Sequence, residues 1–140
     1  MLLLHRPDAL VEPEDVARAF DALHAAGKVR HFGVSNHTPG QIDLLRRYVR
    51  QPLVANQVEL SLLHHHLIDD GVVANTTGHA YASAAGTLDH CCLHDIRVQA
   101  WSPLAGGRLA TTSEFADPVI RATSTLLRQL AEEKGVTPEA

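Results

Sequence analysis

The 140-residue sequence predicts an α/β fold built on a parallel sheet. Four short apolar runs recur with helical segments between them, an alternation typical of βα units. Polar or aromatic side chains follow or end each run: His5, then Ser35 and Asn36, then Gln57, then Trp101 and Ser102. A (β/α) barrel gathers such residues at the carboxyl ends of its strands, whereas an open doubly wound sheet usually has a glycine-rich loop after its first strand. The stretch "HRPDALVE" has no such loop, so the pattern favours a barrel.

The first βα unit begins with the apolar run "MLLLHR". Pro13 opens the helical segment that follows, and the segment ends at Gly27. Acidic residues in the first turn complement the helix dipole, and apolar residues recur at helical spacing at Val16, Phe20 and Leu23. This spacing predicts a helix with one buried face.

The second unit begins with a strand predicted over Phe32–Asn36. The stretch Thr38-Pro39-Gly40-Gln41 has the pattern of a capping box with proline at the first helical position. Apolar residues then repeat on one face at Ile42, Leu45 and Val49. The pattern predicts a second amphipathic helix.

Two further strands are predicted, over Leu53–Leu60 and Ile96–Ser102. Between them, "ANTTGHAYASAAG" has few large apolar groups, so we expect an insertion or surface loop at about 72–86. The stretch "TLDHCCLHD" predicts a short helix.

A longer amphipathic helix is predicted from Asp117-Pro118 to about Lys134, with Gly135 as its stop. Its expected inner stripe consists of Ile120, Leu127, Leu130 and Ala131.

The formal charge of -4 and pI near 6.2 argue against nucleic-acid and anionic-membrane partners, which select basic surfaces. Small molecules and other proteins remain as partners. The apolar opening "MLLLH" is too short for a signal sequence or a membrane span. Cys91 and Cys92 are neighbours, so they form neither a disulfide framework nor a CxxC motif, and we interpret them as helix-packing residues. A reducing cytoplasm fits this sequence best.

Four motifs resemble the aldo-keto reductase family, closest to bacterial oxidoreductases with a tryptophan on the seventh strand: "LLLHRPD", "GKVRHFGVSN", "ANQVE" and "QAWSPLAGGRL". The family folds as (β/α)8 barrels, binds NADPH without a Rossmann fold and reduces aldehydes or ketones. The resemblance implies that this chain is a partial (β/α)8 TIM barrel of about four βα units. Its four strands would correspond to the fourth through seventh of the barrel.

The resemblance also implies roles for individual residues. His5 matches the active-site histidine that orients and polarises the substrate carbonyl. Ser35, Asn36 and Gln57 match the positions that hydrogen-bond the nicotinamide carboxamide. Trp101 matches the aromatic residue that stacks on the nicotinamide ring, and the loop over the pyrophosphate is matched by Ser102, Leu104 and Gly107. These residue types suit an amide, a planar ring and a diphosphate.

Three catalytic positions of the family have no match. Its Asp, Tyr and Lys come from strands that precede the first strand here. Tyr48 falls in a helix and Tyr81 in the expected insertion, while Lys28 and Lys134 lie at helix ends. We therefore expect residues 1–140 to be a partial domain, truncated at both ends and inactive alone. The closing "VTPEA" fits this view, since Thr137 and Pro138 have the pattern of a helix start.

Three other interpretations are weighed against the reductase: a non-catalytic module, an unfolded remnant and a metal hydrolase. A non-catalytic nucleotide-binding or interaction module would keep the cofactor contacts without the acid. The triplet His64, His65 and His66 suggests a metal, but adjacent histidines point in different directions and have no Cys or carboxylate at ligand spacing, so no metal site is predicted. The sequence leaves open the substrate, the choice between NADPH and NADH, and the oligomeric state.

Overall fold

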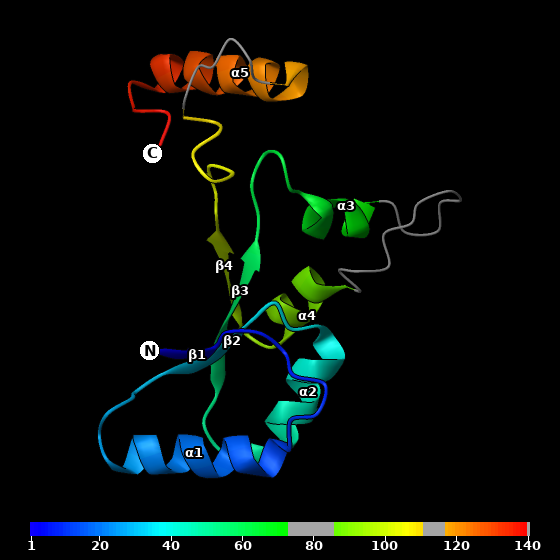
Figure 1. Ribbon diagram of the computed structural model, residues 1–140, viewed down its shortest axis with the longest axis vertical. Coiled ribbons are helices and arrows are strands. Elements are labelled where there is room, and N and C mark those ends of the chain that lie inside the picture. The colour runs from blue at the N-terminus through cyan, green and yellow to red at the C-terminus, as the bar shows by residue number, and fades with distance from the viewer. Residues whose placement is uncertain (73–85, 111–116, 140) are drawn as a thin grey trace. The chain divides into compact units, whose positions relative to one another are not determined.

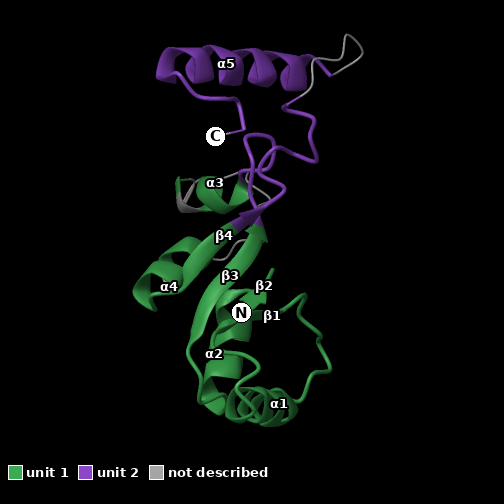
Figure 2. Cartoon of the chain, turned by 90° about the vertical axis from the view of Figure 1, so that its left-hand side faces the viewer, with its two compact units in different colours: residues 1–58, 66–99 green, residues 59–65, 100–140 purple. Residues whose placement is uncertain are grey.

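A computed structural model describes residues 1–72, 86–110 and 117–139 of the chain. The chain divides into two compact units, the first formed by residues 1–58 and 66–99 and the second by residues 59–65 and 100–140 (Figure 2). Apart from its two end residues, the insertion expected at about 72–86 lies outside the described residues.

Strands and helices alternate along most of the described chain (Figure 1). In order, the elements are β1 (Leu2–Leu4), α1 (Pro13–Ala25), β2 (Phe32–Ser35), α2 (Pro39–Tyr48), β3 (Leu53–Glu59), α3 (His66–Val72), α4 (Thr87–Leu93), β4 (Arg97–Trp101) and α5 (Pro118–Lys134). The strands form a four-stranded parallel sheet in the order β1-β2-β3-β4. The predicted α/β class and the four parallel strands are confirmed.

The core of the first unit lies between the sheet and helices α1, α2 and α4. The rings of Phe20 on α1 and Phe32 on β2 stack with centroids 4.2 Å apart, and both are fully buried. Helix α2 lies beside α1 and adds Ile42 and Leu45 to the same core (Figure 1). The helical spacing of these residues in the sequence is therefore explained by one shared apolar contact surface.

Helix α2 begins at the predicted capping box. The Thr38 Oγ1 accepts a hydrogen bond from the Gln41 backbone N–H at 3.4 Å, and the Gln41 Oε1 accepts one from the Thr38 N–H at 2.9 Å. Both bonds satisfy donors that the first helical turn leaves unpaired. The cap sets where the helix starts, and the N-cap Thr38 lies only two residues after Asn36.

Strand β2 passes very close to its neighbours at Gly33. A side chain there would place its Cβ 2.6 Å from the Ala55 carbonyl oxygen and 2.7 Å from the Leu3 side chain. The pairing of β2 with β3 shifts register between Phe32 and Val34, and beyond the shift Ser35 lies opposite Gln57. The register shift therefore determines which side chains meet at the carboxyl ends of the two strands.

In the second unit, α5 begins and ends where predicted. The Asp117 carboxylate accepts a hydrogen bond from the Val119 N–H at 2.8 Å, and Gly135 ends the helix in the left-handed conformation. The buried residues of α5 are Ser124 and Ala131.

One member of the inner stripe expected for α5 is wrong. Leu130 is 45% exposed, while Ile120 and Leu127 are half-buried. Because successive helical residues are about 100° apart around the axis, Leu130 lies beside the face that Ala131 buries.

Two further details differ from the sequence-based expectation. Helix α3 was not predicted, because it is only seven residues long and contains Gly71.

The two cysteines differ in burial. Cys91 is buried against the core as expected. Burial raises the pKa of its thiol, and a hydrogen bond with the Asn56 side chain acts in the opposite direction. Cys92 is exposed, so its interpretation as a packing residue is wrong.

No helix in the described ranges has both the length and the apolar character needed to cross a membrane.

Candidate functional site

Ser35, Asn36 and Gln57 form one hydrogen-bonded group where β2 and β3 end. The Ser35 hydroxyl donates to the Gln57 backbone oxygen at 2.7 Å, and the Asn36 Nδ2 donates to the Ser35 Oγ at 3.0 Å. The Asn36 backbone N–H also donates to the Gln57 oxygen at 2.9 Å. Ser35 is buried, while Asn36 and Gln57 are half-buried, so the group lies at the boundary between core and surface.

The backbone and the next strand orient the two amide side chains. Asn36 has a φ of 59°, a left-handed conformation that asparagine tolerates better than most residues. The Gln57 Nε2 donates to the Gln99 Oε1 of β4 at 3.4 Å. Three parallel strands thus supply neighbouring amide and hydroxyl groups, as the strand-end rule predicted for Ser35, Asn36 and Gln57.

Beneath this group lies a polar bridge between His37 and Asn56 that sequence reasoning missed. The Asn56 Nδ2 donates to the His37 carbonyl at 2.9 Å, and its Oδ1 accepts from the His37 N–H at 3.4 Å. The His37 Nδ1 lies 2.8 Å from the Ser35 carbonyl oxygen. Both side chains are buried, and burial lowers the pKa of His37, opposed by its bond to Ser35. The available signal in the sequence was their position directly beside the predicted site residues Asn36 and Gln57.

His5 is exposed and lies outside that hydrogen-bonded group. It follows β1 and lines a pocket of about 440 Å³ between the 4–11 segment and α2. His37 and Gln41 also line this pocket, and its remaining lining is mostly apolar. The structure therefore places His5 at the predicted carboxyl end of its strand, facing a hollow in the same unit.

The remaining predicted residues belong to the second unit. Trp101 is half-buried at the end of β4, and its carbonyl accepts from the Leu60 N–H at 3.4 Å. Tight turns follow: the Ser102 carbonyl accepts from the Ala105 N–H at 2.8 Å, and the Leu104 carbonyl accepts from the Gly107 N–H at 3.0 Å. These bonds hold Ser102, Leu104 and Gly107 within one compact loop.

The loop over 102–110 has an unusual backbone. Left-handed φ angles occur at Ser102, Ala105, Gly106 and Gly107. A Cβ at Gly106 or Gly107 would meet nothing within 4 Å, so the space beside the backbone is open. Glycine suits these positions because it adopts the left-handed φ angle without strain. The Arg108 Nε donates to the Ala105 carbonyl at 2.8 Å, which holds a cation at the loop. Turns of this kind present backbone N–H groups that suit anions.

The strand-end group of Ser35, Asn36 and Gln57 offers neutral hydrogen-bonding groups. Its amides and hydroxyls both donate and accept, which suits a carboxamide. Tyr48 ends helix α2 and is 41% exposed, and Tyr81 lies outside the described residues. Among the described residues, no tyrosine stands at a strand end as a proton donor.

Comparison with known proteins agrees with this architecture. The chain is 44% identical over 115 residues to "Oxidoreductase YdhF" of Escherichia coli, covering 82% of this chain and 34% of the relative. It is 35% identical over 142 residues to a "6-dehydroglucose reductase" of Agrobacterium fabrum, covering 100% of this chain and 40% of the relative. The chain thus spans between about a third and two fifths of the length of these relatives.

Solved structures share the fold. The glycerol dehydrogenase AKR11B4 from Gluconobacter oxydans matches with a TM-score of 0.69 at 24% identity, over 98% of this chain and 42% of that one. A 2,5-diketo-D-gluconic acid reductase B described as putative matches with a TM-score of 0.62. The family model described as "Aldo/keto reductase family" matches residues 1–140. The chain therefore belongs to the aldo/keto reductase family.

Proposed function

We propose that this chain forms the nicotinamide-contacting part of an NADPH-dependent reductase that converts an aldehyde or ketone to an alcohol. The hydrogen-bonded group of Ser35, Asn36 and Gln57 carries the proposal. These neutral side chains fit a carboxamide, because together they offer both donors and acceptors without adding a charge. When bound, the reduced nicotinamide supplies the hydride.

Each predicted residue then has a task. Ser35, Asn36 and Gln57 would hold the carboxamide and so orient one face of the ring. Trp101, in the second unit, has the planar aromatic side chain that suits a nicotinamide ring. The loop residues Ser102, Leu104 and Gly107 would accommodate the diphosphate, supported by the open left-handed backbone and by the Arg108 cation. His5 would donate a hydrogen bond to the substrate carbonyl and polarise it.

The proton donor for the new alcohol is the missing part. The family's Asp, Tyr and Lys have no counterpart at a strand end in the described residues. We therefore propose that residues 1–140, acting alone, form a partial domain that binds the cofactor without turnover. The free thiols Cys91 and Cys92 fit our placement of the protein in the cytoplasm.

The single tryptophan allows a direct test of cofactor binding. NADPH should quench the emission of Trp101, and Gln57→Ala should weaken binding about 2- to 10-fold through loss of one hydrogen bond. Gln51→Ala is the matched control, because Gln51 bonds to Asp21 and not to the strand-end group. An unchanged Trp101 emission at saturating NADPH would refute the nicotinamide assignment. NADH, titrated in parallel, tests the cofactor preference.

Activity is measured by NADPH consumption with a panel of carbonyl compounds that includes 6-dehydroglucose, the compound in the name of one relative. We expect no turnover by the 140-residue chain, and turnover would show that another residue supplies the proton.

A second candidate, a non-catalytic nucleotide-binding module, is favoured by the absence of a strand-end tyrosine from the described residues. The two functions predict different residues encoded upstream of Met1 in the gene. The reductase requires codons for strand-end Asp, Tyr and Lys residues there. If these are absent, NADPH binding by a cooperatively melting chain indicates the binding module, and no binding indicates an unfolded remnant.

A further inference from the structure

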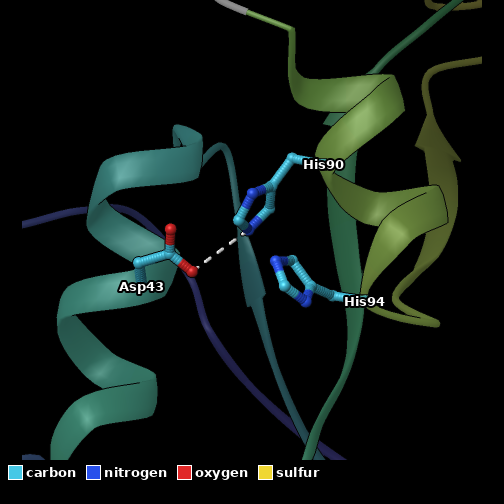
Figure 3. A group of neighbouring side chains, drawn as sticks. All are labelled: Asp43, His90 and His94. Carbon is cyan, nitrogen blue, oxygen red and sulfur yellow. Dashed lines mark ion pairs between the residues drawn. The ribbon is translucent and has the colours of Figure 1, made fainter.

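A cluster of three potential metal ligands lies between α2 and α4, in the first unit. Asp43 comes from α2, while His90 and His94 come from α4 and its carboxyl end, four residues apart (Figure 3). Their side chains point toward one another across the space between the two helices (Figure 3). One ligand atom from each residue can be chosen so that all lie within 4.8 Å of one another. The cluster is distinct from the strand-end group proposed to contact the cofactor.

The separation of the first two ligands suits a shared ion. The His90 Nε2 lies 3.5 Å from the Asp43 Oδ1. Zinc bonds to histidine nitrogen and carboxylate oxygen are about 2.0–2.2 Å long, so a tetrahedral site holds two such atoms about 3.4 Å apart. The same separation is long for a direct hydrogen bond, whose preferred length is about 2.7–3.2 Å. The two atoms are spaced as co-ligands of an ion.

The state of the His90 imidazole is the second observation. The side chain of His90 is 11% exposed, and its Nε2 is buried without a hydrogen-bond partner among the described residues. A buried ring nitrogen without a hydrogen-bond partner costs free energy, unless a donor or a metal ion binds its lone pair or an acceptor binds its proton. The ring of His94 packs edge-on against it, with centroids 4.5 Å apart, and brings a second imidazole to the same place.

The surroundings allow entry of a cation. Asp43 is 57% exposed, which leaves a path from solvent to its carboxylate. Arg46 competes for that carboxylate, with its Nη1 3.6 Å from the Asp43 Oδ1. The Arg46 side chain is itself 38% exposed, so it can turn into solvent when an ion binds.

We propose that Asp43, His90 and His94 bind one divalent transition-metal ion, with Zn²⁺ the best match to two imidazoles and a carboxylate. Water completes the coordination. Because the ligands come from both helices, the ion joins α4 to α2 and stabilises the helix layer of the first unit. This site is independent of the proposed reductase function.

The first test is Zn²⁺ titration by calorimetry of the 140-residue chain, purified without a histidine tag. We expect one ion per chain at this site and a rise of several degrees in the melting temperature. His90→Gln and His94→Gln should each weaken binding at least about tenfold, and Asp43→Asn should weaken it as well. The matched control His64→Gln/His65→Gln removes two histidines of the triplet and should leave binding at the cluster unchanged.

The second measurement guards against variants that fail to fold. Asp43→Asn changes an exposed side chain with no change of shape, and far-UV circular dichroism checks that each variant keeps its helices. Co²⁺ reports ligand number through its visible absorption, which should decrease in intensity in His94→Gln. Absence of Zn²⁺ binding to the unmodified chain, or equal binding by the chain and by folded His90→Gln/His94→Gln, would overturn the proposal. The three residues would then be an ordinary ion pair and ring contact.

Discussion

The two units of the chain bury very different amounts of apolar side chain. In the first unit, Phe20, Phe32 and Ile42 are fully buried and contact one another through a common core. In the described part of the second unit, Leu109 is the large side chain that reaches the same burial, while α5 leaves Val119, Leu126 and Leu130 exposed. The strand-end group of Ser35 and Gln57 thus belongs to a unit with several large buried side chains, whereas the loop after β4 is held by its turns and by one large buried side chain, Leu109.

The largest expected effect comes from deleting a core ring of the first unit. Phe20→Ala should lower the free energy of unfolding by about 3–5 kcal/mol, because it removes the partner of Phe32 and leaves a cavity. Urea denaturation followed by circular dichroism measures the change. Leu10→Ala is the control: Leu10 is 88% exposed, so the change should stay within about 0.5 kcal/mol. Equal effects of the two substitutions would contradict the description of the core.

A pair of glycine substitutions should act in opposite directions. Gly33→Ala should cost about 1–3 kcal/mol, since the new methyl group would collide with the Ala55 carbonyl oxygen on the neighbouring strand. Gly40→Ala, in helix α2 with nothing within 4 Å of the new Cβ, should stabilise by about 0.5–1 kcal/mol. Thermal denaturation gives the sign of each change, and stabilisation by Gly33→Ala would disprove the close strand approach.

The buried histidine of the first unit should make stability depend on pH. Burial lowers the pKa of His37, so the folded state keeps the imidazole neutral while the unfolded chain protonates it. His37 therefore contributes its full stability above the ordinary imidazole pKa of about 6.5, and this is lost as pH falls toward the lower folded-state pKa. Urea midpoints between pH 8 and pH 5 should fall less steeply in His37→Gln. Parallel curves for the two proteins would rule out this linkage.

The smallest effect is expected on helix α5 of the second unit. Leu130→Ala should change stability by less than about 0.5 kcal/mol, because Leu130 is 45% exposed. Leu127→Ala, at a half-buried position on the same helix, should cost about 1–2 kcal/mol. Hydrogen exchange of the α5 amides distinguishes the two. A larger loss from Leu130→Ala would show that the sequence-based stripe was right after all.

Much of the fold could be predicted because its signals are local. The capping box at Thr38 and Gln41 and the glycine stop at Gly135 act within one helical turn, and both are confirmed. Helix α3 escaped prediction, because a seven-residue helix carries too little periodicity. The exposure of Leu130 and Cys92 also escaped it, because periodicity gives the direction of a side chain but not what covers it.

In the candidate site too, some residues could be predicted from the sequence and others could not. Ser35, Asn36 and Gln57 could be predicted as neighbours, since parallel strands bring their carboxyl ends to one edge. The bridge between His37 and Asn56 could not, because it depends on the register shift between β2 and β3. The cluster of Asp43, His90 and His94 had a partial signal in the four-residue spacing of its histidines. Its carboxylate comes from a distant helix, so the sequence drew attention to the triplet at residues 64–66 instead.

By itself, the sequence determined the order of the strands and of every described helix except α3, the capped starts of α2 and α5, and the chemical types of residue at each strand end. These follow from interactions between residues a few positions apart. Only the tertiary structure decided which faces are covered, which strand residues pair, and which side chains from separate elements share one place. Those outcomes depend on packing between segments remote in the chain, where a shift of one residue in register moves every side chain to the other face.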